Sequence, residues 1–183
     1  MSSVRAKRRG ALRAPLFIAV VLVAVALSRC GSGDDSTEPS GPVSAKVTHV
    51  VDGDTIDVAL PDGSEDTVRY IGIDTPETVK PDTPVQCGGP QAHAVNDRLV
   101  AGRMVTLRFD AERRDVYGRL LAYVYLPRRA PARRPLFVNA ELVRRGLART
   151  LTIPPNDSFA PLFARLAARA GASGRGLWGH CSL

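Results

Sequence analysis

The sequence predicts an α+β domain, built as a small closed five-stranded β-barrel of the OB type with three α-helices. Short valine-rich segments alternate in polarity and are separated by tight turns, which indicates a meander of strands. One helical segment follows the third strand and two follow the fifth, as in a small OB-type barrel. The predicted strands are 43–51, 55–61, 67–73, 104–110 and 119–126, and the predicted helices are 90–102, 140–145 and 159–170.

Turn and capping residues set the limits of these elements. Asp52-Gly53 is a hairpin-turn dipeptide, and the next turn is predicted at 62–66. Pro90 is suited to the first turn of a helix. Asn139 and Ser158 are expected to cap the second and third helices through their side chains. The proline- and arginine-rich stretch 127–135 is predicted to be an exposed loop.

The N-terminal 42 residues are expected to lie outside the folded domain. Residues 1–30 carry five basic residues followed by 15 uncharged, mostly apolar ones, which is typical of an export signal. Cys30 follows directly and resembles a lipoprotein acylation site, although Arg29 precedes it where small residues are usual. Lipidation, ordinary secretion and an uncleaved anchor therefore stay open. Residues 31–42 are predicted to be a disordered linker, and residues 43–183 form the domain.

The net charge of +7 belongs mainly to the export segment, because residues 1–30 hold six basic residues and no acid. The remaining chain is nearly neutral but polarised. Residues 31–97 hold 13 acids and 3 bases, whereas residues 98–149 hold 13 bases and 4 acids. Such a chain could hold a cation beside a polyanion, although surface charges that simply cluster would give the same composition.

The stretch "RYIGIDTPET" (69–78) carries the main functional signal. Strand alternation places Arg69 with Ile71 and Ile73 on the inward face. A buried guanidinium group requires an anionic partner. Either a structural ion pair with Asp54 or Asp74, or a bound phosphate, would satisfy it. Asp54 could likewise do no more than cap the turn before it.

The functional interpretation joins these residues to Glu77 and Arg119. Two carboxylates at neighbouring strand ends can bind a hard cation such as Ca²⁺. Two arginines can clamp a phosphate group. A third carboxylate can then orient or deprotonate an attacking water.

The motifs "VVDGDTIDV", "VRYIGIDTPET", "DVYGRLLAYVY" and "GLWG" resemble the staphylococcal nuclease family over about residues 43 to 178. The resemblance implies Ca²⁺-dependent hydrolysis of DNA and RNA that leaves 3′-phosphorylated products. It assigns Ca²⁺ to the side chains of Asp54 and Asp74 and the backbone carbonyl of Thr75. The remaining roles it implies are Glu77 as general base, Arg69 and Arg119 as ligands of the scissile phosphate, and Tyr117 as a donor to a terminal phosphate.

The sequence departs from that family at the base-binding wall. Thr152 and Pro154 stand where its best-known member has two tyrosines, and Val116 replaces a lysine that contacts phosphate. A weaker grip on the nucleotide is expected. The rival interpretations are a non-catalytic OB-fold module that binds nucleic acid, and an inactive lipoprotein domain. Aromatic residues make up only 5% of the chain, which disfavours a binder that relies on base stacking.

The exported context predicts a disulfide between Cys87, before the first helix, and Cys181, after Trp178. A zinc site from Cys87, His93, His180 and Cys181 is the alternative, with poor geometry because two of its ligands are adjacent. Trp178 and Phe163 are expected in the core. We expect a monomer that is secreted or lipid-anchored at the outer face of the cell membrane.

Overall fold

The computed structural model describes residues 41–78, 84–127 and 134–181. The predicted export segment with Cys30 lies outside these residues, as do the linker up to residue 40 and most of the predicted loop 127–135. None of the helices within the described part is long and apolar enough to cross a membrane.

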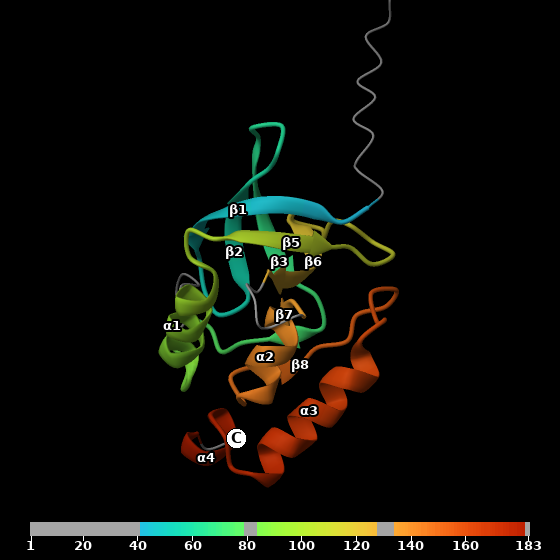
Figure 1. Ribbon diagram of the computed structural model, residues 1–183. Helices are drawn as coiled ribbons and strands as arrows, with labels where there is room; N and C mark the ends of the chain where they lie inside the picture. Colours follow the sequence, from blue (N-terminus) through green and yellow to red (C-terminus); the bar gives the residue numbers. More distant parts are fainter. Residues whose placement is uncertain (1–40, 79–83, 128–133, 182–183) are drawn as a thin grey trace, which may run out of the picture. The chain divides into compact units, whose positions relative to one another are not determined.

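The barrel is formed by the five longest strands (Figure 1). They are β1 (Val43–Val50), β2 (Thr55–Ala59), β3 (Glu65–Tyr70), β5 (Met104–Arg108) and β6 (Leu120–Leu126). Antiparallel pairing runs in the order β3-β2-β1-β5-β6, and β3 also pairs with β6 in parallel, with Val68 opposite Leu120. This last pairing closes the sheet, so the predicted closed five-stranded barrel is confirmed.

Three two-residue strands were not predicted. Of these, β7 (Leu136–Phe137) extends the sheet beyond β6. The other two, β4 (Ile73–Asp74) and β8 (Arg149–Thr150), pair with each other below the barrel and place Asp74 opposite Arg149.

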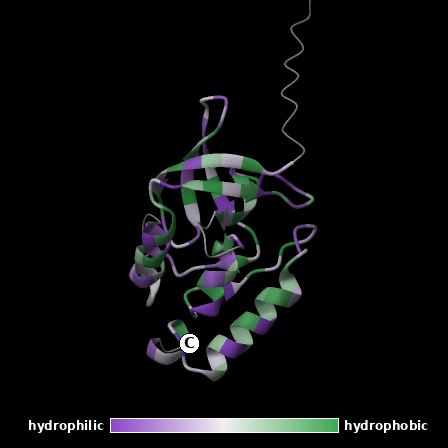
Figure 2. Ribbon diagram, viewed as in Figure 1, coloured by the Kyte–Doolittle hydropathy of each residue, from purple (hydrophilic) through white to green (hydrophobic). Residues whose placement is uncertain are grey.

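Apolar and polar residues alternate along barrel strands (Figure 2), and the apolar ones are buried. In β1 the side chains of Val43, Ala45 and Val47 are buried and those between them are exposed. This period-two pattern is the reason that the segment forms a strand with one face on the core. Phe163 is buried as expected, but Trp178 is 38% exposed, so its predicted place in the core is wrong.

The predicted third strand, 67–73, is interrupted. The chain turns at Gly72, whose φ is 79°, and this turn separates β3 from β4. Within β3 the buried side chains are Val68 and Tyr70, so Arg69 points to the opposite side of the strand. The prediction that Arg69 shares an inward face with Ile71 and Ile73 is wrong, because alternation holds only within an uninterrupted strand.

The three predicted helices are present, with a fourth helix of one turn. They are α1 (Gly89–Val100), α2 (Val138–Arg144), α3 (Ala160–Ala172) and α4 (Leu177–His180). Neither predicted side-chain cap forms: the N-cap positions of α2 and α3 are Phe137 and Phe159. Asn139 is instead buried, accepts from the Val124 amide at 2.9 Å and donates to the Ile71 carbonyl at 2.9 Å. It thereby fixes the turn after β3 to β6.

Candidate active site

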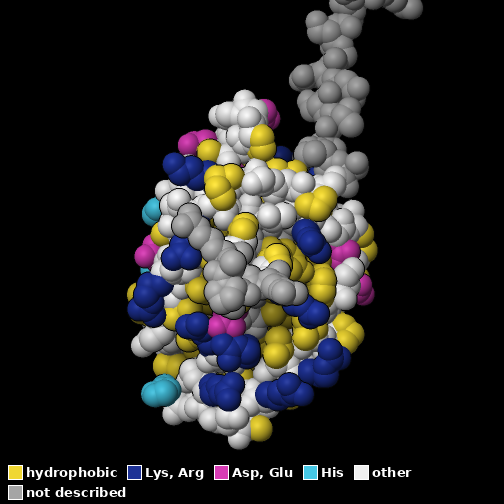
Figure 3. All heavy atoms as spheres, in the orientation of Figure 1, with side chains coloured by type: hydrophobic (Ala, Val, Ile, Leu, Met, Phe, Trp, Pro, Cys, Tyr) yellow, Lys and Arg dark blue, Asp and Glu magenta, His cyan; other side chains and the backbone are white. Residues whose placement is uncertain are grey.

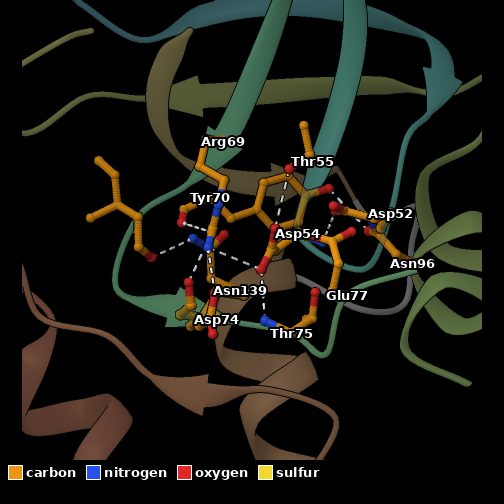
Figure 4. A network of polar contacts seen from close by, with 12 residues as sticks. Asp52, Asp54, Thr55, Arg69, Tyr70, Asp74, Thr75, Glu77, Asn96 and Asn139 are labelled. Carbon is orange, nitrogen blue, oxygen red and sulfur yellow. Dashed lines mark hydrogen bonds and ion pairs between the residues drawn. The ribbon is translucent and has the colours of Figure 1, made fainter. Parts of the chain in front are cut away.

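Asp54 is the buried centre of the site (Figure 4). It lies just before β2. The Asp52 side chain accepts a hydrogen bond from the Asp54 amide at 2.9 Å and so stabilises the turn. The Asp54 Oδ2 accepts from the Thr75 amide at 2.7 Å, and its Oδ1 accepts from the Thr55 hydroxyl at 3.2 Å. Burial raises the pKa of Asp54 to about 7, against the opposing attraction of the Arg69 guanidinium. A cation beside this carboxylate would favour its charged form.

Arg69 joins the two aspartates. Its Nη2 lies 3.2 Å from Asp54 Oδ2 and 2.9 Å from Asp74 Oδ1. Its Nη1 donates to the backbone carbonyls of Tyr70 at 2.9 Å and Ile73 at 2.8 Å. These bonds wrap the guanidinium around the Gly72 turn and fix its orientation. The contacts of Arg69 in this structure are therefore those of the ion-pair interpretation.

The donor set around Arg69 fits a hard cation. The carboxylates of Asp54 and Asp74 converge on one guanidinium nitrogen, and Thr75 follows directly in the chain. Oxygen atoms of this kind are the ligands that Ca²⁺ prefers. No cluster of three or more histidine, cysteine, aspartate or glutamate side chains that could hold a metal occurs among the described residues. A cation here would therefore depend on two carboxylates, a carbonyl and water.

The backbone of Glu77 is held by Gln86 from the far end of the loop. The Glu77 amide donates to Gln86 Oε1 at 3.1 Å, and the Gln86 amide donates to the Glu77 carbonyl at 3.0 Å. The Glu77 Oε1 accepts a hydrogen bond from the Thr78 amide at 2.9 Å. Figure 4 shows Glu77 in the same cluster as Asp54 and Thr75. Sequence analysis missed Gln86, and the only signal was its proximity to Cys87.

Cys87, next to Gln86, is disulfide-bonded to Cys181, with a Cα–Cα distance of 5.8 Å. Both thiols are consumed by this bond, which leaves no sulfur ligand for the alternative zinc site at Cys87, His93, His180 and Cys181. The chain after α4 is thus attached to the loop that carries Glu77 and Gln86.

Arg119 and Tyr117 line a cavity of about 340 Å³, which Arg69 also lines. Asp115 positions Arg119: it accepts from Arg119 Nε at 2.7 Å and forms an ion pair with Nη2 at 2.7 Å. The remaining N–H groups stay available for a ligand. The Arg119 guanidinium lies 5.5 Å from the centre of the Tyr117 ring, which is 81% exposed. The sequence did not point to Asp115, because its neighbours indicate only a turn.

Leu151 and Ile153 belong to the apolar lining of this cavity, with Ile71, Ile73 and Leu121. Thr152 and Pro154, at the positions of the two tyrosines, are not among the lining residues. Exposed Val116 completes the rim. Aliphatic side chains therefore stand beside the two arginines.

Two groups of predicted site residues result. The first group, at the beginning of β2 and the ends of β3 and β4, consists of Asp54, Arg69, Asp74, Thr75 and Glu77. A second group, Tyr117 and Arg119, comes from the segment before β6 and lines the same cavity as Arg69, because β3 and β6 run side by side. Fold and site together define an OB-type domain in which two arginines line a cavity that could receive a phosphate ester, and two aspartates contact one of these arginines.

Comparison with known proteins gives the family. Residues 67–180 match the family described as "Staphylococcal nuclease homologue". The chain is 36% identical to a protein named "Thermonuclease" from Staphylococcus intermedius, over 89% of this chain and 95% of the relative. It is 38% identical to the Staphylococcus hyicus "Thermonuclease" over 74% and 75% of the two chains. It is 42% identical to "Endonuclease YncB" of Bacillus subtilis over 66% and 54%. The chain belongs to the staphylococcal nuclease family.

Proposed function

We propose that this protein is a Ca²⁺-dependent nuclease that hydrolyses phosphodiester bonds of DNA and RNA and leaves 3′-phosphorylated products. Relatives named thermonuclease and endonuclease support the nuclease activity. The observation that carries the proposal is that Arg69 and Arg119 line one cavity, while Asp54 and Asp74 form ion pairs with Arg69. An arginine pair beside carboxylates suits a phosphate diester and a hard cation together.

The Asp54 and Asp74 carboxylates and the Thr75 carbonyl would hold Ca²⁺. When bound, the ion supplies positive charge that polarises a phosphoryl oxygen. Arg69 already has its orientation set by two backbone carbonyls. A group that needs no rearrangement at the moment of reaction is well suited to stabilise charge that develops on phosphorus.

Arg119, which lines the same cavity as Arg69, binds the same phosphate. Asp115 holds its Nε and Nη2, which leaves the N–H groups of Nη1 to meet a phosphate oxygen. Tyr117, whose ring lies beside Arg119, donates its hydroxyl to a neighbouring terminal phosphate. Glu77 acts as general base and takes the proton of the attacking water. The 5′-oxygen of the scissile ester leaves.

Loss of the general base or of a phosphate ligand tests this mechanism. In the full-length chain, Glu77→Gln and Arg119→Ala should each lower kcat by orders of magnitude with Ca²⁺ saturating, because both groups act chiefly in the transition state. Glu65→Gln, an exposed change of the same chemistry on β3, is the matched control and should retain activity.

Chelation should abolish hydrolysis, and added Ca²⁺ should restore it. Near-normal turnover of Glu77→Gln or Arg119→Ala would reject the assigned roles. Binding of oligonucleotides without any hydrolysis by the unaltered chain would instead favour the non-catalytic OB-fold module.

We further propose that the protein is an exported monomer. Residues 1–30 act as the export segment, residues 31–42 as a linker to the domain 43–183, and Cys30 is the acceptor for a lipid. The mass of the mature N-terminal peptide distinguishes acylation from simple cleavage, and Cys30→Ser should shift an acylated protein from the detergent phase to the aqueous phase. Size-exclusion chromatography with light scattering tests the monomer.

A further inference from the structure

Six exposed arginines gather over α2, β8 and α3. We call this surface the arginine face, and its members are Arg144, Arg145, Arg149, Arg165, Arg169 and Arg175. Figure 3 shows dark-blue side chains gathered over the lower half of the molecule, where Figure 1 places α2 and α3. The site residues described above do not include any of them.

Most of this positive charge is not neutralised by the protein. Between Val138 and Cys181 the only acidic residues are Glu141 and Asp157. Glu141 forms ion pairs with both Arg144, at 2.6 Å, and Arg145, at 2.7 Å. Within the described residues, no carboxylate lies within ion-pair distance of the other four arginines of the face. Four guanidinium groups without an ion pair among the described residues, on a chain that is nearly neutral beyond residue 30, indicate a surface that meets an anion.

The arginine face begins beside the candidate active site. Arg149 of β8 lies opposite Asp74 of β4, and the Leu151 amide donates to the Gly72 carbonyl at 3.1 Å. The start of α3 also reaches this point, because Phe163 packs directly against Gly72.

From there the face follows α3 away from the site. Arg165 and Arg169 are four residues apart and therefore lie on one side of the helix. At the far end Arg175 Nη1 donates to the Arg144 carbonyl at 3.5 Å, which brings the ends of α2 and α3 together. The 13 residues of α3 span about 20 Å, so the face can contact several successive phosphates.

We propose that the arginine face binds the phosphate backbone of the polynucleotide strand beyond the scissile phosphate. This inference rests on the proposed function, because the face leads out of the proposed active site. Guanidinium groups in a row match phosphates, and the four unpaired ones lose no protein ion pair when they bind. The interaction is with the backbone, so it favours long strands over short ones without regard to sequence.

The test compares two full-length triple variants that remove equal charge. Arg165→Gln/Arg169→Gln/Arg175→Gln neutralises the face. Lys46→Gln/Arg98→Gln/Arg103→Gln neutralises exposed residues at β1 and α1. Arg149 is left unchanged because it lies beside Asp74. Both variants carry Glu77→Gln, and binding of a fluorescent 30-nucleotide single strand is measured by anisotropy in chelator at several salt concentrations. Unfolding temperatures confirm that the variants are folded.

We expect the face variant to bind the 30-mer at least about tenfold more weakly at low salt. The slope of log K against log salt should fall by about 2, which corresponds to three lost phosphate contacts on a single strand. The control variant should keep the slope of the parent. With Glu77 restored, the ratio of kcat/KM for the 30-mer to kcat/KM for a dinucleotide should fall about tenfold in the face variant.

An unchanged salt slope, or an equal loss in both triple variants, would overturn the proposal. The proposal would also be overturned if the face variant lost binding to vesicles of phosphatidylglycerol and phosphatidylcholine but kept its binding to the oligonucleotide. The face would then serve an anionic membrane. The outcome is separable from the nuclease assignment. A parent chain that hydrolyses nothing but binds strands through the face would reject the nuclease alone, and an active parent with no face effect would reject the face alone.

Discussion

The disulfide between Cys87 and Cys181 should be the largest single contribution to stability that a substitution can remove. It closes a loop with a sequence separation of 94 residues. The chain-entropy relation, with this separation as the loop length, gives about 4.7 kcal/mol at 25 °C. The figure is an upper value, because an unfolded chain with residual structure has less entropy to lose.

The variant to measure is Cys87→Ser/Cys181→Ser in the full-length chain. For a domain of this size, about 4.7 kcal/mol corresponds to a fall in Tm of roughly 15 °C. Urea unfolding with and without reductant should show the parent losing the same stability on reduction, while the double variant is unaffected. Each single variant should match the double one, and Cys30→Ser should change nothing.

The same variant reports on the loop that carries Glu77. Cys87 follows Gln86, which holds the Glu77 backbone at both its amide and its carbonyl. We expect kcat to fall more than KM changes, since Glu77 is proposed to act on the attacking water and not on substrate binding. A stability loss below about 1 kcal/mol would refute the reasoning that this bond constrains the unfolded chain and the loop. An m-value equal to that of the parent, together with an unchanged kcat, would refute it as well.

Three further predictions concern substitutions of single residues. Asn96→Ala should destabilise the fold by about 1–3 kcal/mol in urea unfolding, because it leaves the buried Tyr70 hydroxyl and the Asp52 carbonyl without their partners at 3.0 Å; a loss below 0.5 kcal/mol (about the error of such a comparison) would contradict this. Gly72→Ala should cost about 2–4 kcal/mol, since the new Cβ meets the Phe163 ring at a positive φ; Gly63→Ala, also at positive φ but with open space around it, should cost only the backbone part, about 1–2 kcal/mol. Partial burial opposes ionisation of Asp110, but hydrogen bonds from Tyr123 and Ser158 hold its pKa below the usual value. Asp110→Asn should therefore cost about 1 kcal/mol at pH 7, and the difference from the parent should shrink as pH falls below about 4, the unfolded value; a difference that grows in acid would refute the assignment.

The amino-acid sequence by itself determined the barrel strands and the identity of the candidate site residues. Both depend on local information. Alternating valines with Asp-Gly turns specify strands within a few residues, and the spacing of Arg69, Asp74 and Glu77 lies within one short stretch. The fold class and the family resemblance follow from those patterns.

Tertiary structure decided where the side chains point and what they meet. Alternation was expected to place Arg69 inward with Ile71 and Ile73. In the structure Val68 and Tyr70 take the buried side of β3, the Arg69 guanidinium contacts Asp54 and Asp74, and the chain turns at Gly72 before Ile73. Parallel pairing of β3 with β6 is a contact between distant segments, so no local propensity encodes the approach of Arg119 to the cavity.

The remaining differences have the same origin. Asn139 was expected to cap its own helix, yet it bonds to Ile71 and Val124, which lie far from it in the chain. In the sequence Gln86 and Asp115 cannot be told from ordinary loop residues. The fold brings them into contact with Glu77 and Arg119. The arginine face is likewise invisible in the sequence, where its members are spread over some thirty residues. Only the packing of α3 against α2 brings their charges to one surface, because long-range contacts and not local preferences fix that arrangement.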